Sequence, residues 1–597
     1  MAKSKDVVKQ GPQYGSDLIV DLMKAFDIEY AAFIPGSTFR GIHDSIVNYG
    51  GNRNPQVIFC CHEEISVALA HGYAKAKGKP MAAIVHNIVG LQHASMAIYN
   101  AWCDRIPIIV LGGTGPMDTT RRRPRIDWIH TALVQGNQVR DYVKWDDQPA
   151  TISSFPMSFI RAHRIATTEP KAPVYICYDA DLQEDRIRGK IAVPDLSGFA
   201  PAAPVPANPE ALRKAAQLLV DAAAPLIITE TLGRNHGTVA ALIELAELLA
   251  IPVVDKVGNR KPGGFNFPNT HPLDVTGAER EYVPKADVIL ALDLPDLYGS
   301  LITIDRVTRA SRYITKPSGK IIQISMHDML IRSWAGDYQC LQAVDVPITA
   351  ETSVAVPELT QLCRQLLGDD KKKKQRIETR LAGAKKTHET LRSQWLTEAR
   401  TAAKRPAIAT SFLAMELWEV VKKEDWALVN GSANLWARKL WDWTRPYQYL
   451  GPNGGGGVGY GMSASIGAAL AHLGTGKLCI DIQDDGDLLM TTSALWTAAH
   501  HRIPLLIVMY NNRSFYNSEA HAISMAKSRN RPLENAGIGT RLDAPAVDFA
   551  KMANSYGIHG EGPIVRPEDL RPALERALKV VKNKRLPALV DVVTEAR

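Results

Sequence analysis

Short apolar runs alternate with amphipathic stretches between about residues 14 and 185. The runs at 30–36, 56–62, 81–86 and 106–113 have the length and apolar content of strands that are buried on both faces of a sheet. The stretch at 63–77 lies between two of these runs and has the pattern of a helix. This order predicts a parallel α/β layer in the N-terminal part of the chain.

The same alternation returns twice toward the C-terminus. A second α/β unit is predicted by apolar runs at 225–230, 251–256, 286–293 and 320–325, and a third by runs at 425–430, 477–483, 503–512 and 588–593. Residues 191–208 are rich in Pro and Ala, as linkers are, and residues from about 366 to 405 are highly charged and helical in character. We therefore expect an α/β fold with three doubly wound parallel-sheet domains, at 11–190, 206–365 and 405–597.

Two segments of the outer units resemble each other. Residues 104–110 are DRIPIIV, and residues 501–508 are HRIPLLIV. Because any buried parallel strand is rich in β-branched residues, this similarity supports one fold for both outer units without requiring it.

The bulk composition is that of an ordinary globular protein of about three domains, with 597 residues, 46% hydrophobic and 22% charged. The net charge of +8 is partly concentrated at Arg121, Arg122, Arg123 and Arg125 and in the lysine run at 371–374. No aromatic residue interleaves the lysine run to stack on bases, so we expect no nucleic-acid partner. Trp128 and His130 closely follow the arginine cluster, which is kept as a candidate for binding an anionic substrate.

Cysteine usage and the absence of long apolar segments bear on the compartment. The seven cysteines include no CxxC pair, which indicates neither a disulfide framework nor a cysteine zinc cluster and fits a reducing cytosol. Residues 1–17 hold no apolar core of signal-peptide length, and no run of about eighteen uncharged apolar residues occurs. We expect a cytoplasmic protein with no membrane partner.

Acidic and amide side chains follow two neighbouring apolar runs of the third unit. Asp484, Asp485, Gly486 and Asp487 end one run, and Asn512 ends the next, 27 positions after Asp485. Parallel strand ends open on one crevice, where a carboxylate and a carboxamide oxygen can hold one hard cation and a helix N-terminus can face phosphate. Either half alone is more often a simple turn. The pair together points to magnesium diphosphate.

At this spacing the segment resembles the GDG…NN signature of thiamine-diphosphate enzymes of the acetolactate synthase, pyruvate decarboxylase and benzoylformate decarboxylase superfamily, and the resemblance extends over nearly the whole chain. It implies that thiamine diphosphate binds through Mg²⁺, with Asp485, the Asn512 side chain and the Ser514 backbone carbonyl as metal ligands. Cofactor contacts from Gly486, Asp487 and Tyr516 are implied as well. The chain departs from the signature at Asp484, where the family has Gly, and a carboxylate beside a diphosphate costs electrostatic energy.

A glycine run precedes the signature, at 454–461, and leads into a small-residue helix. Glycine permits close backbone approach to a ligand, although a lone glycine run is more often a flexible loop. The resemblance implies that Val458 wedges between the two rings of the cofactor. It further implies that the Gly456 carbonyl accepts a hydrogen bond from the 4′-amino group of the pyrimidine.

The first unit contributes Cys61-His62-Glu63-Glu64 at a predicted strand end. A Glu in a first helical turn is usually a dipole partner. Glu63 stands nine residues before Gly72, however, and there resembles the cofactor-activating glutamate of the family, whereas Glu64 falls one place late. That resemblance implies that Glu63 holds a proton against the pyrimidine N1′ and so helps to form the C2 carbanion.

Two residues of the first unit resemble the substrate-handling pair of benzoylformate decarboxylases. Ser37 follows Pro35-Gly36, and His86 ends the run at 81–86. His86 could relay protons near neutral pH, and its alternative role is that of a packed histidine bonded to backbone. Further pocket candidates are His93, Trp102, Tyr516 and His521.

The resemblance implies a 2-oxo acid decarboxylase, with possible ligation to an aldehyde or a second 2-oxo acid, assembled as a homodimer or homotetramer. Acetolactate synthase proper and an inactive cofactor-binding scaffold or regulatory subunit are the alternatives. FAD is not expected, because the segment 291–297 offers no cation for a flavin diphosphate. The substrate and acceptor stay open.

Overall fold

The computed structural model describes residues 11–257, 263–305, 307–330 and 340–595. Residues 1–10 lie outside the described part, and with them most of the segment in which we expected no signal peptide. Small portions of the predicted second and third domains also lie outside it. The chain divides into two compact units, residues 1–202 and 203–597, which are described in turn.

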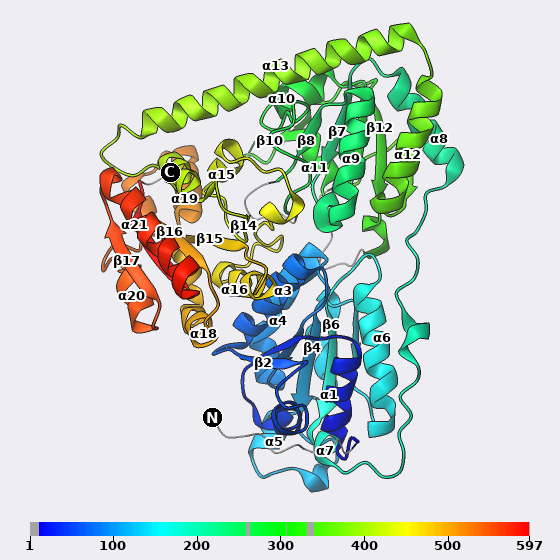
Figure 1. Cartoon of the computed structure of the whole chain (residues 1–597), viewed down its shortest axis with the longest axis vertical. Helices are drawn as coiled ribbons and strands as arrows, with labels where there is room; N and C mark the ends of the chain where they lie inside the picture. The colour runs from blue at the N-terminus through cyan, green and yellow to red at the C-terminus, as the bar shows by residue number, and fades with distance from the viewer. Residues whose placement is uncertain (1–10, 258–262, 306, 331–339, 596–597) are drawn as a thin grey trace. The chain divides into compact units, whose positions relative to one another are not determined.

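The first unit contains a six-stranded sheet in which every pairing is parallel, in the order β2-β1-β3-β4-β6-β5 (Figure 1). Its strands are β1 (Tyr30–Phe33), β2 (Gln56–Phe59), β3 (Ala82–Val85), β4 (Ile109–Thr114), β5 (Trp145–Asp147) and β6 (Val174–Asp179). β3, β4 and β6 are buried along their whole length, as an apolar parallel strand covered on both faces must be.

In the described part of this unit, seven α-helices accompany the sheet. They are α1 (Gly15–Ala25), α2 (Arg40–Asp44), α3 (Glu63–Lys77), α4 (Ile88–Asp104), α5 (Ile126–Ile129), α6 (Phe155–Thr167) and α7 (Ala180–Glu184). The longer ones, α1, α3, α4 and α6, have buried apolar residues. His62 caps α3 by accepting a hydrogen bond from the Glu64 amide, and Gly78 ends the helix in the left-handed conformation. The sequence therefore places Glu63 at the first position of α3, beside the end of β2.

The second unit begins with a five-stranded parallel sheet in the order β13-β12-β9-β7-β8. Its strands are β7 (Pro225–Thr229), β8 (Val253–Asp255), β9 (Val288–Leu292), β12 (Lys320–Ser325) and β13 (Val346–Thr349). An antiparallel hairpin of β10 (Ile302–Ile304) and β11 (Ser311–Tyr313) is separate from it. The helices of this part are α8 (Pro209–Asp221), α9 (His236–Leu249), α10 (Glu279–Tyr282), α11 (Leu297–Ser300) and α12 (Thr352–Leu367).

The same unit ends with a third parallel sheet in the order β14-β15-β16-β18-β17. Its strands are β14 (Trp426–Leu428), β15 (Leu478–Asp484), β16 (Leu506–Asn511), β17 (His559–Ile564) and β18 (Ala588–Val593). The helices are α14 (Thr410–Val421), α15 (Trp436–Leu440), α16 (Gly461–Ala471), α17 (Asp485–Met490), α18 (Ala494–His500), α19 (Tyr516–Ser528), α20 (Phe549–Ser555) and α21 (Pro567–Lys579).

The first and third sheets share their connectivity. The order β1-β3-β4-β6-β5 of the first corresponds to β14-β15-β16-β18-β17 of the third. The two similar sequence segments occupy the same place in this plan, since Arg105 and Arg502 both take positive φ (56° and 53°) after a helix and lead through Ile-Pro into β4 and β16. The similarity between residues 104–110 and 501–508 thus reflects one structural element used twice.

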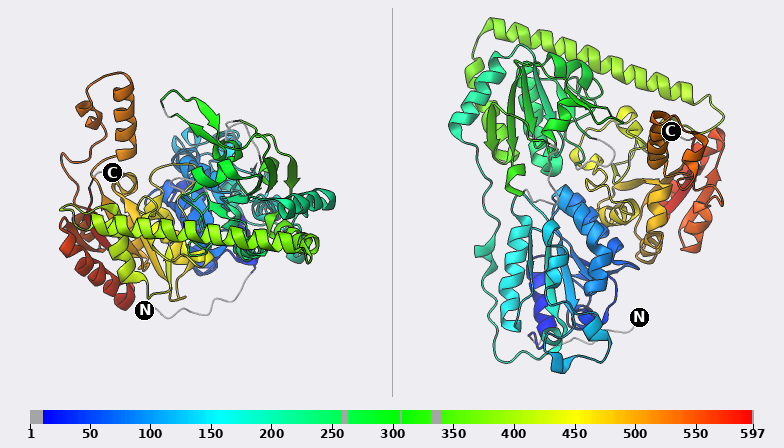
Figure 2. Two further views of the ribbon diagram at one scale, coloured as in Figure 1. Left: turned by 90° about the horizontal axis from the view of Figure 1, so that it is seen from above. Right: turned by 180° about the vertical axis from the view of Figure 1, so that it is seen from behind.

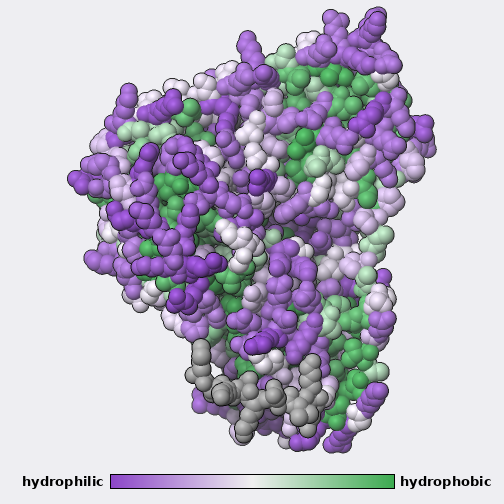
Figure 3. All heavy atoms as spheres, viewed as in Figure 1, coloured by the Kyte–Doolittle hydropathy of each residue, from purple (hydrophilic) through white to green (hydrophobic). Residues whose placement is uncertain are grey.

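A long helix, α13 (Lys371–Ala402), connects the two sheets of the second unit (Figure 2). Asp370 caps it by accepting from the amides of Lys372 and Lys373, and the lysine run forms its first turn. Most of its side chains are exposed, and the surface along it is largely hydrophilic (Figure 3). The lysine run is therefore part of a solvated helix, and the expectation of no nucleic-acid partner stays a prediction.

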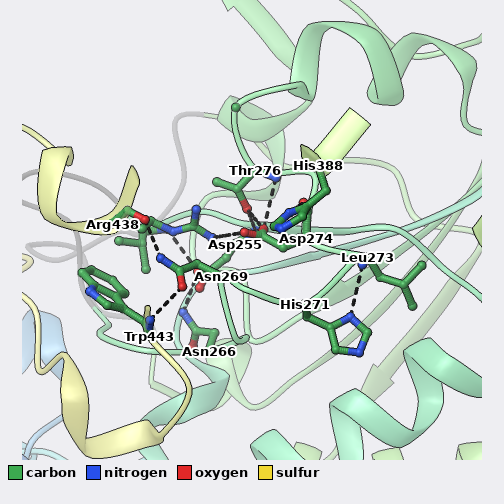
Figure 4. A network of polar contacts seen from close by, with 12 residues as sticks. Asp255, Asn266, Asn269, His271, Leu273, Asp274, Thr276, His388, Arg438 and Trp443 are labelled. Atoms are coloured by element: carbon green, nitrogen blue, oxygen red, sulfur yellow. Dashed lines mark hydrogen bonds and ion pairs between the residues drawn. The ribbon is translucent and has the colours of Figure 1, made fainter. Parts of the chain in front are cut away.

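A buried polar network joins the two parts of the second unit (Figure 4). Arg438 of α15 forms an ion pair with Asp274 at 3.1 Å, and the exposed fractions of the two side chains are 4% and 3%. The Asn269 side chain donates to the Trp441 carbonyl (2.9 Å) and accepts from the Trp443 amide (2.8 Å). Since buried polar groups are stable only when paired, this network fixes one packing of the central part against the third sheet.

The expected fold class is confirmed: each apolar run that was predicted to be a strand forms one, in three parallel sheets. The exact domain boundaries stay predictions. Six strands were not predicted, namely β5, β6, β10, β11, β13 and β17. β6 has a clear apolar signal, whereas β5 has three residues and β17 is a half-exposed edge strand with two glycines, so neither resembles a buried strand.

Candidate functional site

The carboxyl edge of the third sheet lines a cleft of about 480 Å³. β15 and β16 pair in parallel register, with Asp484 opposite Tyr510, so that the residues after both strand ends lie at this edge. The lining includes all residues of this unit that were predicted to bind cofactor or metal: Gly456, Val458, Asp485, Gly486, Asp487, Asn512, Ser514 and Tyr516.

The three predicted metal ligands are linked by hydrogen bonds: the side chains of Asp485 and Asn512 both accept from the backbone amide of Ser514. The Ser514 amide donates to Asp485 Oδ2 (3.3 Å) and to Asn512 Oδ1 (2.9 Å). Asp485 is buried, and burial raises its pKa to about 6, although a hydrogen bond from the Gly486 amide opposes this shift. A buried carboxylate beside a carboxamide oxygen is a donor set that suits Mg²⁺, and a bound cation would restore the charged form that burial disfavours.

Asp487 holds the glycine loop that precedes α16. Its carboxylate accepts from the amides of Gly459 (2.8 Å) and Gly461 (2.9 Å), at the N-terminus of the helix. Gly456 has a φ of 68°, which favours glycine, and Asn453 donates to the Gly457 carbonyl at 3.0 Å. The loop therefore has a defined shape rather than being a flexible run. The cofactor contact predicted for Asp487 stays a prediction.

A buried polar network beneath the cleft was missed by the sequence analysis. Asn430, just beyond β14, donates to Asp481 Oδ1 (3.0 Å) and to Gln483 Oε1 (3.4 Å). Gln483 in turn donates to Asp487 (2.7 Å), and burial raises the pKa of Asp481 to about 7. The network thus connects polar residues of β15 and of the segment after β14 to Asp487, which holds the glycine loop. Asn430 follows an apolar run as Asn512 does, which is the signal that could have identified it.

Asp484 lies in the cleft lining, next to Asp485. It ends β15, and its negative charge adds to the upward shift of the Asp485 pKa, after burial. Gly486 makes room for a ring, because a Cβ there would lie 2.5 Å from Phe515. His521 is exposed on α19 and does not line this cleft.

The first unit places Glu63 in a crowded position at the start of α3. Its side chain is buried, and Oε2 lies 3.2 Å from His93 Nδ1 of α4. A Cβ on Gly90 would lie 2.6 Å from Glu63 Oε1 and 2.6 Å from the Cβ of His86. Gly90 is therefore the residue that leaves space for the Glu63 carboxylate. Glu64 is only half-buried, and the choice of Glu63 as the cofactor-activating residue stays a prediction.

His86 follows β3 and lies near Glu63, since a Cβ on Gly90 would be 2.6 Å from both residues. Its Nδ1 accepts from the Asn87 amide (2.9 Å) and contacts Thr38 Oγ1 (3.2 Å), and its ring packs edge-on against His130. Burial lowers the pKa of His86, and the neighbouring His130 adds to the effect. Thr38, next to Ser37 in the short helix η1 (Ser37–Phe39), is the hydroxyl that contacts this ring, and it was not predicted.

Two of the four arginines of the cluster, Arg121 and Arg123, form ion pairs with neighbouring carboxylates. Arg121 forms a bidentate pair with Asp185 at 2.9 Å, and Arg123 pairs with Asp127 at 2.7 Å. Arg123 also reaches the Ser37 carbonyl at 3.5 Å and adds to the lowered pKa of His86. The cluster therefore contributes mainly structural ion pairs, with Arg123 closest to the predicted substrate residues. Trp102 is buried within α4.

In the central part, the carboxylates of the loop after β9 are held by neighbouring groups. Asp293 accepts from Thr352 Oγ1 at 2.6 Å, and Asp296 accepts from the Gly299 amide at 2.7 Å. Across the described parts of the chain, every helix is either too short or too polar to cross a membrane.

Comparison with known proteins gives matches over most of the chain. Residues 13–138 match the family described as thiamine pyrophosphate enzyme, N-terminal TPP binding domain, and residues 430–592 match its C-terminal TPP binding domain. A benzoylformate decarboxylase of Pseudomonas aeruginosa is 25% identical, covering 89% of this chain and 91% of its own length. The acetolactate synthase large subunit of Haemophilus influenzae is 22% identical, covering 96% and 93%.

A solved structure has the same fold. The thiamine diphosphate-dependent 4-hydroxybenzoylformate decarboxylase of Rhodococcus jostii superposes with a TM-score of 0.74 over 98% of this chain and 99% of its own, at 18% identity.

Proposed function

The chain belongs to the thiamine pyrophosphate enzyme family, and from this premise we propose that it is a Mg²⁺-dependent 2-oxo acid decarboxylase with a capacity for carboligation. The proposal rests on one observation. The side chains of Asp485 and Asn512 both accept a hydrogen bond from the Ser514 amide, at the edge of a cleft large enough for a cofactor. Thiamine diphosphate, when bound, supplies the electron sink that allows a bond next to a carbonyl to break.

The third sheet binds the diphosphate end. Asp485, Asn512 and the Ser514 carbonyl would hold Mg²⁺, and the backbone amides at the start of α17 would be available to the phosphates. Asp487 keeps the glycine loop in place, so that Val458 and the Gly456 carbonyl stand ready for the two rings of the cofactor. These residues position the cofactor rather than react.

The first unit supplies the acid and base groups. With the cofactor bound, Glu63 would hold a proton against the pyrimidine ring, and its burial would keep water away from that proton. His86 gives a proton to the product at the end of the reaction, and Ser37 orients the substrate carboxylate. Because the cofactor needs residues of both units, we propose that two copies of the chain assemble as a homodimer or homotetramer and complete each other's sites.

The relatives' names support the substrate class. One relative is a benzoylformate decarboxylase and another an acetolactate synthase large subunit, both names that refer to chemistry of 2-oxo acids or their products. We propose a 2-oxo acid as substrate, with an aldehyde or a second 2-oxo acid as possible acceptor, and no flavin requirement. A stoichiometric flavin absorption band in the purified protein would contradict the last point.

The test is a panel of 2-oxo acids incubated with the full-length protein, thiamine diphosphate and Mg²⁺. CO₂ and the carbonyl products are measured together. Aldehyde released in proportion to CO₂ supports decarboxylation, and 2-hydroxy ketone or acetohydroxy acid products indicate ligation. Cofactor binding without CO₂ release from any acid would overturn the proposal in favour of an inactive scaffold.

A further inference from the structure

Three side chains with metal-binding atoms converge in the first unit. His62 and Glu63 begin α3, and His93 projects from α4 toward them. One donor atom from each lies within 4.8 Å of the others. His93 Nδ1 is 3.2 Å from Glu63 Oε2, and the rings of His62 and His93 are stacked with centroids 4.7 Å apart.

The donor set, and the separation of one pair of its atoms, match those of zinc sites. Two imidazoles and one carboxylate form a common three-ligand set for Zn²⁺, with a fourth position left to water. With bonds of about 2.0–2.1 Å, two ligands of a tetrahedral ion lie about 3.3 Å apart. The 3.2 Å between His93 Nδ1 and Glu63 Oε2 is already close to that value, so an ion can take both atoms with little movement.

Access and preorganisation also suit an ion. Glu63 is 5% exposed, so its carboxylate has little freedom, whereas the His93 side chain is 57% exposed and opens to solvent. His62 uses Nδ1 to accept from the Glu64 amide at 3.2 Å. Metal binding at that nitrogen replaces a helix cap contact.

We propose that His62, Glu63 and His93 bind a transition-metal ion of the Zn²⁺ class in the cofactor-free protein. The site discriminates against Mg²⁺, which prefers oxygen ligands, while imidazole suits zinc and its neighbours. The inhibitory consequence rests on the proposed function: if Glu63 must face the cofactor, an ion held by its carboxylate blocks activation. Binding of Zn²⁺ at this site and activation of the cofactor then exclude each other. Mg²⁺ does not block activation in this way, because the site discriminates against it.

Another histidine–carboxylate pair provides the matched comparison. His271 Nε2 lies 3.2 Å from Glu247 Oε1, the same separation as in the His93–Glu63 pair. No second histidine completes a cluster there among the residues that the structure describes. If the His93–Glu63 contact were only a hydrogen bond, the two pairs would behave alike toward metals.

The experiment uses Co²⁺ as a spectroscopic probe on the metal-free, cofactor-free full-length protein, with excess Mg²⁺ present to occupy the oxygen ligands around Asp485. We expect a visible ligand-field band that saturates at one Co²⁺ per chain and is displaced by Zn²⁺. His93→Ala and His62→Gln should each weaken binding at least about 10-fold. His271→Ala should leave it unchanged. Circular dichroism and thermal unfolding check that each variant is folded.

The outcomes separate this site from the proposed function. Absence of the band in wild-type protein, or equal binding by a folded His93→Ala variant, overturns the metal site and leaves the proposed function untouched. Zn²⁺ added before thiamine diphosphate should slow the appearance of activity, and Zn²⁺ added afterwards should act far less. A stoichiometric Co²⁺ band without this order effect would keep the site and overturn its inhibitory role.

Discussion

Replacement of Gly90 by Ala tests whether the Glu63 carboxylate must occupy its observed position. The new Cβ would lie 2.6 Å from Glu63 Oε1, where ordinary contacts begin at 3.4 Å, so the carboxylate must shift by about 0.8 Å. The same Cβ would lie 2.6 Å from the Cβ of His86, which prevents the helix from simply moving that way. Since a displacement of about 1 Å at a reacting group can cost about 100-fold in rate, we expect a loss of turnover of that order.

Stability should change much less than turnover. Overpacking costs about 1–3 kcal/mol, and Ala in place of Gly within a helix returns about 1 kcal/mol. Gly383→Ala in α13 is the matched control, because a Cβ there meets nothing within 4 Å; this variant should keep full turnover. The assay is CO₂ release with thiamine diphosphate and Mg²⁺, beside thermal unfolding of each variant. A folded Gly90→Ala variant with turnover within about threefold of wild type would refute the reasoning.

Three further changes test other parts of the site. Asp484→Gly removes a carboxylate that would repel a diphosphate; at a separation of about 8 Å and an effective dielectric constant of about 20, this repulsion is worth up to about 2 kcal/mol. Calorimetry should therefore show thiamine diphosphate binding up to about 30-fold tighter. Equal or weaker binding would show that the carboxylate is turned away or helps to hold the metal. His86→Ala should slow aldehyde release by about 100-fold or more, with cofactor binding nearly unchanged. Ser37→Ala should mainly raise the KM for the 2-oxo acid. Unchanged rates and products in both variants would show that His86 and Ser37 are packing residues. Arg438→Met leaves Asp274 buried without its ion-pair partner, and denaturant unfolding should show that the free energy of unfolding falls by about 3–5 kcal/mol. Adding Asp274→Leu should recover much of this loss. A fall of less than about 1 kcal/mol would contradict the described burial.

Features that depend on local pattern could be predicted from the sequence. The strands follow apolar runs, and α3 was predicted at Glu63–Lys77, where the structure has it, because a stretch with a helical pattern lies between two of these runs. Asp485 and Asn512 could be paired because parallel strand ends share one edge of a sheet. The resemblance to thiamine-diphosphate enzymes is confirmed by the family matches at both ends of the chain.

Features that depend on the path of the backbone could not be predicted. Asp274 and Arg438 are 164 positions apart, and no local signal relates them. The contacts of His93 with Glu63 and of Thr38 with His86 arise because helices and loops from separate strands meet at one sheet edge. A histidine in an amphipathic helix and a threonine in a turn have no distinctive pattern, so only the fold reveals them.

The central claim is that Glu63 activates a bound thiamine cofactor. Its most direct test measures two quantities on one preparation of Glu63→Gln: thiamine diphosphate binding by calorimetry and CO₂ release from the best 2-oxo acid of the panel. The substitution keeps size and removes the acidic proton, so we expect binding within about threefold of wild type and turnover reduced by at least about 100-fold. Near-normal turnover by Glu63→Gln with the cofactor bound would contradict the account.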